Sequence, residues 1–271
     1  NPGDTVLFNN SGSVTPPINL SIIAAPAAMT VNAGLNYTII GTGALSGTMT
    51  LTKSGSGRLT LANSGGNTFT GGTTISAGSL QVGDGISVNG NLPGPISIGG
   101  TLIYANPTDA MTVAIHTGNG TMVKQGGGTL TINSTNSSFS GGVVIGGGAI
   151  TLGTGAALNT GGLTLTNGGT FNLPPSSPSY NYTGSITVPA NQSGTISSPG
   201  LANTLSGNLF SGNTNSVLNL SSGVSMGGTT SAQFDTFTGT INVLSGATLR
   251  FSANSSGNTF GSLVPTFSVD G

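Results

Sequence analysis

The chain has 271 residues and a formal net charge of −1, and 3 % of its residues are charged, against about 25 % in an ordinary globular domain. So few Lys and Arg exclude nucleic acids and anionic membranes as partners, and the lack of an apolar run of about 18 residues excludes a membrane-spanning helix. The 48 glycines and the abundant Thr, Ser, Asn, Val and Ile favour strands and turns, so the composition predicts an all-β fold.

The first segment, residues 1–31, contains the most apolar stretch of the chain. Apolar side chains dominate between residues 18 and 31, and three prolines in and just before this stretch exclude a helix. We therefore expect an extended segment that acts as a cap or as a strand between subunits, followed by one β-helix domain over residues 32–271. The candidate contact residues of this segment are Ile18, Leu20, Ile22 and Ile23.

One pattern occurs three times along the rest of the chain. Residues 51–82 return at 122–152, and a looser copy lies at 239–262. Between the copies run short segments in which apolar and polar residues alternate, bounded by Gly, Asn or Pro. Alternation buries one face of a strand. Segments this short, with few Asn-Gly pairs of the hairpin type, favour stacked parallel coils over an antiparallel meander or a disordered chain.

These observations predict an elongated parallel β-helix with about 20 to 27 residues per coil. Like residues stack above like residues in such a fold, and stacked like charges repel one another, which accounts for the scarcity of charge. Thr, Ser and Asn can instead form hydrogen bonds to their stacked copies. The residues predicted to face inward in the first copy are Leu51, Leu59, Leu61, Phe69, Ile75 and Leu80.

The first copy, LTKSGSGRLTLANSGGNTFTGGTTISAGSLQV, closely resembles the autotransporter-associated β-strand repeat. The second copy keeps Lys124 and Phe139 but has Ser137 and Ser138 in place of Asn-Thr, and the third copy has no Lys. The resemblance implies a secreted, right-handed β-helix of bacterial surface proteins, either the passenger of an autotransporter-like protein or a free extracellular protein. The positions that carry it in the first copy are Lys53, Gly55, Gly57, Leu59, Leu61, Asn67, Thr68, Phe69, Gly71, Gly72, Thr73, Ile75, Gly78 and Leu80.

The sequence offers little for catalysis. Polysaccharide lyases and hydrolases with a β-helix fold need at least two neighbouring carboxylates, and such an enzyme stays the second alternative. The sole histidine, His116, is expected at an outward or corner position. Lys53 and Lys124 are expected on one edge of the coils with their amines in water. We predict no catalytic, metal-binding or cofactor-binding residue, and we expect turn-forming roles for the five acidic residues, Asp4, Asp84, Asp109, Asp235 and Asp270.

Two tyrosines stand out in the Pro-rich segment LPPSSPSYNYTG, residues 173–184. Tyr180 and Tyr182 are separated by Asn181 and can lie on one side of the segment. They are expected either to form a patch that stacks on sugars or contacts another subunit, or simply to pack within the segment.

The last candidate residues lie near residue 271, where Val264, Phe267 and Val269 are not matched by a further full coil. Uncapped coils at both ends of a β-helix are complementary, because each end presents open strand edges and apolar core. We therefore expect an extracellular filament or matrix subunit whose main partner is itself, head to tail, with surface glycans as a further partner. The first alternative is a passenger fragment of an autotransporter-like adhesin.

Overall fold

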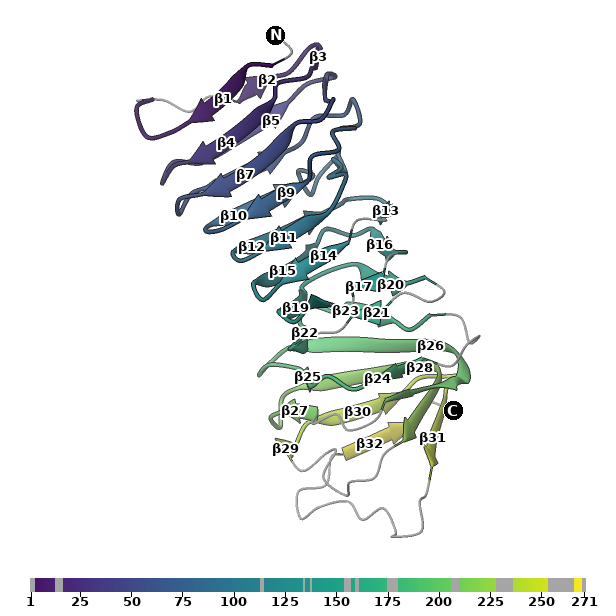
Figure 1. Cartoon of the computed structure of the whole chain (residues 1–271). Coiled ribbons are helices and arrows are strands. Elements are labelled where there is room, and N and C mark those ends of the chain that lie inside the picture. Colours follow the sequence, from purple (N-terminus) through teal and green to yellow (C-terminus); the bar gives the residue numbers. More distant parts are fainter. Residues whose placement is uncertain are drawn as a thin grey trace.

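The computed structural model describes residues 3–12, 17–112, 115–133, 135–136, 138–153, 157–158, 161–174, 180–205, 210–227, 236–252 and 266–269. These residues form strands and no helix, and all their strand pairs are parallel. The strands stack along one elongated body, with the N-terminus at one end and the last strands towards the other (Figure 1). The predicted all-β, parallel β-helix fold is confirmed.

Three large sheets run along this body, and two of them begin in the first coil. Within the described residues, sheet A has seven strands, in the order β1 (Thr5–Phe8), β4 (Ala28–Asn32), β7 (Thr50–Ser54), β9 (Thr73–Ile75), β11 (Ile96–Ile98), β14 (His116–Gly118) and β18 (Ser138–Phe139). Sheet B has eleven described strands, in the order β2 (Ile18–Asn19), β5 (Tyr37–Ile40), β8 (Arg58–Leu61), β10 (Ser79–Val82), β12 (Thr101–Ala105), β15 (Thr121–Gln125), β19 (Gly142–Ile145), β22 (Gly162–Leu165), β25 (Ile186–Thr187), β27 (Phe210–Gly212) and β29 (Thr236–Phe237).

The third side of the coil changes along the chain. Near the N-terminus it carries a small sheet, sheet C, formed by β3 (Ile23–Ala24) and β6 (Ala44–Leu45). A second small sheet pairs β17 (Thr135–Asn136) with β21 (Ala157–Leu158). The ten described strands of sheet D are β13 (Ala110–Thr112), β16 (Thr129–Ile132), β20 (Ala149–Leu152), β23 (Gly169–Asn172), β24 (Asn181–Tyr182), β26 (Ser193–Leu205), β28 (Val217–Gly227), β30 (Thr240–Val243), β31 (Thr248–Ser252) and β32 (Thr266–Val269).

The pairing partners in sheet B define the length of one coil. Ser79 of β10 pairs with Arg58 of β8, one coil earlier, and with Thr101 of β12, one coil later. The interval between partners is longer towards the C-terminus, where Ser211 of β27 pairs with Thr236 of β29. The intervals in both regions fall within the coil length predicted from the sequence.

The core is a set of apolar columns that run along the body. In sheet B one column of inward side chains is buried from the second coil to β27, and each member pairs in register with the next. Burial of each large apolar side chain contributes roughly 1.5–3 kcal/mol. The six residues predicted to face inward, from Leu51 to Leu80, are all buried, so that prediction is confirmed. The members of the sheet B column are Tyr37, Leu59, Leu80, Leu102, Met122, Val143, Leu163, Ile186 and Phe210.

Asn67 of the predicted Asn-Thr-Phe triplet holds the third side of the coil where no strand forms. Its Oδ1 accepts hydrogen bonds from the backbone N–H of Leu45 at 2.9 Å and from Nδ2 of Asn63 at 2.8 Å. Its Nδ2 donates to the carbonyl of Asn91, one coil further on, at 3.0 Å. Three successive coils are therefore tied together by one buried amide.

The described part of residues 1–31 forms the first coil and most of β4, the first strand of the second coil. β1, β2 and β3 pair with β4, β5 and β6, respectively. At the other end of the chain, the predicted third copy contributes β30 and β31, and its Ile241 is buried in the core. Residues 253–262 of that copy lie outside the described residues.

Candidate functional sites: an open first coil, a surface groove and buried lysines

The first coil presents three strand edges. β1, β2 and β3 each pair on one side with the next coil, and no described residue pairs with their other side. The free backbone N–H and C=O groups of an edge strand can bind a further parallel strand.

Inside this first coil lies a cavity of about 430 Å³ with a mostly apolar lining. The predicted contact residues Ile18, Leu20, Ile22 and Ile23 line it, from β2, the following turn and the start of β3. Ile22 is 67 % exposed and Ile23 is 74 % exposed, so two large apolar side chains flank the opening.

At the opposite end, Val269 of β32 is also strongly exposed. It pairs in register with Val243, which itself pairs with Leu220, so Val269 continues a column of inward apolar residues. The backbone of Phe267 pairs in register with that of Ile241, which is buried. Val264 lies outside the described residues.

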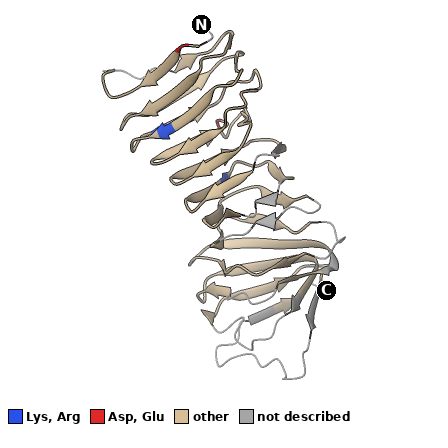
Figure 2. Ribbon diagram, viewed as in Figure 1, with Lys and Arg blue, Asp and Glu red and all other residues tan. Residues whose placement is uncertain are grey.

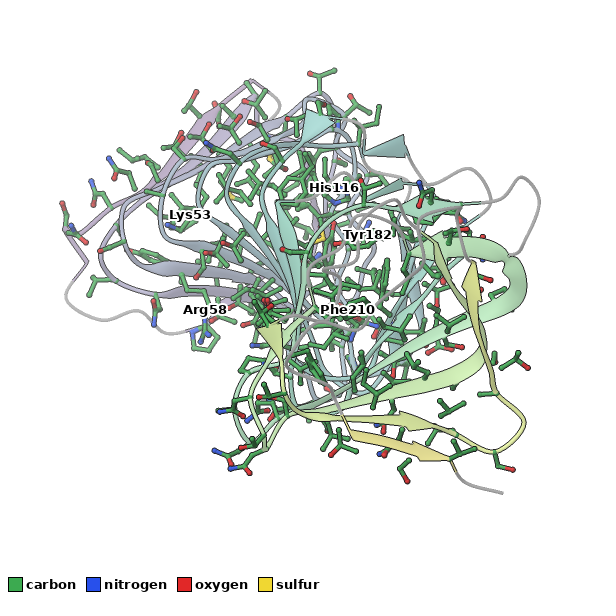
Figure 3. All side chains as sticks on the ribbon, turned by 90° about the horizontal axis from the view of Figure 1, so that it is seen from below. Lys53, Arg58, His116, Tyr182 and Phe210 are labelled. Atoms are coloured by element: carbon green, nitrogen blue, oxygen red, sulfur yellow. The ribbon has the colours of Figure 1, made fainter. Side chains whose placement is uncertain are left out.

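The structure separates the two tyrosines of the predicted patch. Tyr182 is 2 % exposed, and its ring packs edge-on against Phe171 at a centroid distance of 5.5 Å. It therefore lies in the core instead of on the surface (Figure 3). Tyr180 is partly buried against the same core, and its backbone N–H donates to Oδ1 of Asn203 at 3.0 Å.

His116 lies inside the coil, so the expectation of an outward or corner position is wrong. His116 pairs with Ile96 in sheet A, and Ile96 pairs with Thr73. His116 therefore belongs to the same inward column as these two residues. Its Nε2 and the hydroxyl oxygen of Tyr104 lie 2.8 Å apart, and the two rings are T-shaped at 6.0 Å.

A groove of about 470 Å³ crosses the outer face of β5, β8 and β10. Its floor contains Thr38 and Thr60, which pair in register, and Arg58 and Asp84 also line it. The backbone of Arg58 pairs with Ser79 of β10, and its N–H donates to Oδ1 of Asn36 at 2.8 Å. Its guanidinium has no hydrogen-bond or ion-pair partner among the described residues. Charged residues are few along the described ribbon (Figure 2), and Arg58 is an exposed one.

Asp84 organises the loop beside this groove, as expected of a turn-forming aspartate. Its Oδ1 accepts the backbone N–H groups of Ile86, Ser87 and Val88, each at 2.8 Å, and its Oδ2 accepts the Ser87 hydroxyl at 2.9 Å. Burial opposes the charge, but these hydrogen bonds outweigh it and lower the pKa of Asp84 to about 2. Asp84 is therefore a carboxylate at any physiological pH.

The two repeat lysines are fully buried, so the expectation that their amines lie in water is wrong. Lys53 Nζ donates to the backbone carbonyls of Ser54 and Gly55, both at 2.8 Å, and to that of Ala77 in the next coil at 3.3 Å. Lys53 belongs to an inward column in which Val31 lies on one side and Ile75 on the other. The alternation in Leu51-Thr-Lys53 already places Lys53 on the same face as Leu51, and this was the sequence pattern that could have located it.

Lys124 repeats this arrangement. Its Nζ donates to the carbonyls of Gln125 at 2.6 Å, Gly126 at 3.0 Å and Gly147 of the next coil at 3.4 Å. Burial lowers the pKa of Lys53, and burial likewise lowers the pKa of Lys124, against the attraction of Asp109, to about 8.

The two lysines do not share an edge of the coils, contrary to expectation. Lys53 lies in β7 of sheet A, whereas Lys124 lies in β15 of sheet B, between Tyr104 and Ile145. The following strands shift in the same way, because Leu59 lies in sheet B and its counterpart Leu130 in sheet D. The second copy of the repeat is thus turned by one face of the coil relative to the first.

Groups suited to metal binding or paired-carboxylate chemistry are sparse. The described residues contain no group of three or more His, Cys, Asp or Glu side chains that could hold a metal ion. The groove and the first-coil cavity each have one carboxylate in their described lining, Asp84 and Asp4. In the described part of the chain, no helix has the length and apolar character needed to cross a membrane.

Two segments, residues 51–82 and 122–152, match the family model described as Passenger-associated-transport-repeat. They coincide with the first two copies predicted from the sequence and contain both buried lysines, whereas the predicted third copy at 239–262 is not among the matched residues. No curated protein and no solved structure matches the chain. The predicted resemblance is confirmed: two segments of the chain match the passenger-associated-transport-repeat model, and both lie within a parallel β-solenoid.

Proposed function

We propose that the chain is an extracellular structural protein of a bacterial surface that assembles end to end into a filament or matrix. The observation that carries this proposal is the first coil, where three strand edges surround an apolar cavity flanked by exposed Ile22 and Ile23. Val269, which is exposed on an inward column at the other end, supports a complementary surface there.

Two physical effects favour contacts between the ends of two copies. Stacking one coil on another satisfies the backbone groups of edge strands and removes apolar side chains from water, which stabilises by roughly 25 cal/mol per Å² of apolar surface buried. A surface with few exposed charges also lacks the repulsion that normally keeps molecules apart. The occupant of the first coil is then the last coil of a second copy.

Charge placed at the opening of the first coil tests the proposal. The double variant Ile22→Asp/Ile23→Asp is expected to stay monomeric at concentrations at which the wild type forms filaments, because the contact would bury two carboxylates without partners. Light scattering and negative-stain electron microscopy measure the outcome. Deletion of this stretch is less suitable, because Met29 and Val31 nearby belong to the core.

The matched control is Ile86→Asp. Ile86 is 85 % exposed in the loop after β10, away from both ends, so this variant adds a carboxylate without touching the proposed contact. It should assemble like the wild type. Monomeric wild-type protein at high concentration, or assembly of the double variant with the wild-type profile, contradicts end-to-end assembly and favours the passenger of an adhesin.

A second candidate function, glycan binding by such an adhesin, is favoured by the groove on β5, β8 and β10. Its Thr floor offers hydroxyl groups. The guanidinium of Arg58, which has no partner among the described residues, can bind a carboxylate in bidentate fashion. We infer that a carboxylate-bearing saccharide fits the groove better than a neutral one.

Calorimetric titration with an acidic and a neutral oligosaccharide of equal length tests this second candidate. The acidic ligand should bind more tightly, and Arg58→Gln should weaken its binding roughly ten-fold or more while leaving the neutral ligand unchanged. Equal affinity for the two ligands, or an unchanged affinity in Arg58→Gln, contradicts a role for this groove.

A further inference from the structure

The two buried lysines occupy the same local structure on two different faces of the coil. In each case Nζ donates to three backbone carbonyls: that of the last residue of its own strand, that of the glycine that begins the following turn, and one from the corresponding turn of the next coil. The turn glycines Gly55 and Gly126 have φ values of +74° and +77°, a backbone conformation that other residues adopt only with strain. The arrangement is therefore built by the repeat and does not depend on the position of the coil in the rod.

The next coil contributes a second glycine to each arrangement. Gly78 and Gly148 have φ values of +63° and +60°, and a Cβ at Gly78 would lie 2.8 Å from Lys53 Nζ and 2.6 Å from the carbonyl oxygen of Gly57. Lys53 pairs with Ile75 of the next coil, and Gly78 lies in the turn after Ile75. The chain between Lys53 and Gly78 is therefore longer than one coil. Each of the two matched repeats is long enough to contain its lysine and both turns that surround it.

A buried ammonium is costly unless its N–H groups are satisfied. The three hydrogen atoms of each ammonium match the three carbonyl acceptors in number, and hydrogen bonds with a charged donor are about twice as strong as neutral ones. An apolar side chain in the same place would remove the hydrogen bonds that the ammonium donates to these carbonyls. The charge is therefore a means of joining two coils.

We propose that the two turns form a cation-binding cage, specific for a primary ammonium group, which each repeat fills with its own lysine. The ammonium links one coil to the next, and all its acceptors are backbone carbonyls, so the arrangement can form on any face of the solenoid. The lysine acts as an internal ligand of this site.

Replacement of Lys53 by Met and by Ala tests the cage. Lys53→Met keeps an unbranched, apolar side chain of similar length, and we expect its Tm to fall by roughly 5–10 °C because the cage is left empty of charge. Lys124→Met should show a similar loss on the other face. If the charge were merely tolerated, Met at either position would leave the Tm unchanged or raise it, and that result overturns the proposal.

Lys53→Ala adds a test of binding itself. The atoms removed beyond Cβ correspond to n-propylammonium, so n-propylammonium chloride should raise the Tm of Lys53→Ala in a saturable manner and leave the wild type unchanged. Sodium chloride at equal ionic strength and the neutral isostere n-propanol should give no such rise. If Lys53→Ala is unfolded, its refolding yield in the same three solutions is the readout. Equal rescue by n-propanol, or no rescue by n-propylammonium, overturns the cation cage.

Discussion

At the scale of single residues, several of the described charged side chains bind backbone groups. Lys53 and Lys124 donate to carbonyl oxygens, and Asp84 accepts N–H groups. In each case the partner is a turn whose backbone groups converge because glycines allow it. Since backbone groups are present at every turn, these charges need no oppositely charged side chain, which is consistent with the low count of ionisable residues.

The variant Asp84→Asn tests whether the charge of the Asp84 carboxylate stabilises the fold through its hydrogen bonds to backbone N–H groups. The folded-state pKa of Asp84, about 2, lies below its ordinary value of 3.8, so the carboxylate stabilises the fold above about pH 4 and this contribution disappears as the pH falls towards 2. The wild type should therefore be more stable than Asp84→Asn at neutral pH, and the difference should shrink between pH 4 and pH 2. Chemical denaturation at several pH values measures it. A difference that stays constant over this range would show that the carboxylate charge plays no part.

At the scale of elements, alternation predicted the strands well and the turns poorly. The inward Leu and Ile residues follow from period two, and the same rule would have placed Lys53 and His116 inside, had their polarity not argued against it. The cage depends on carbonyls brought together by the stacking of turns from successive coils, which no local pattern contains. The groove likewise depends on a loop lying beside two strands of earlier coils.

Two glycine substitutions separate backbone strain from crowding in these turns. Gly66→Ala and Gly78→Ala both place Ala at a positive φ, +70° and +63°, but a Cβ at Gly66 meets nothing within 4 Å. Gly66→Ala should lower the free energy of unfolding by roughly 1–2 kcal/mol through strain alone. Gly78→Ala should lower it by about 1–3 kcal/mol more, because its Cβ meets the carbonyls of Gly55 and Gly57. Equal losses in thermal or chemical denaturation would contradict the packed turn.

At the scale of the whole molecule, the spacing of the repeats and the coil length together set the geometry. The copies begin at residues 51 and 122, whereas three coils counted from Leu51 reach only as far as His116, so the second copy comes to lie one face further round. The spacing of the repeats could be read from the sequence, but the coil length could be predicted only to within several residues. Over three coils this error adds up to more residues than one face of the coil contains. The elongated fold was therefore predictable, and the placement of the repeats around it was not.

This turn of one face has a mechanical consequence. Hydrogen bonds between coils along a single edge resist bending away from that edge, because such bending pulls the coils apart there, and they add little resistance to bending in other directions. Because the first fastening lies in sheet A and the second in sheet B, resistance to bending is spread over different directions. Further repeats added at the same offset would place their lysines on successive faces around the axis, and the rod would then resist bending in every direction.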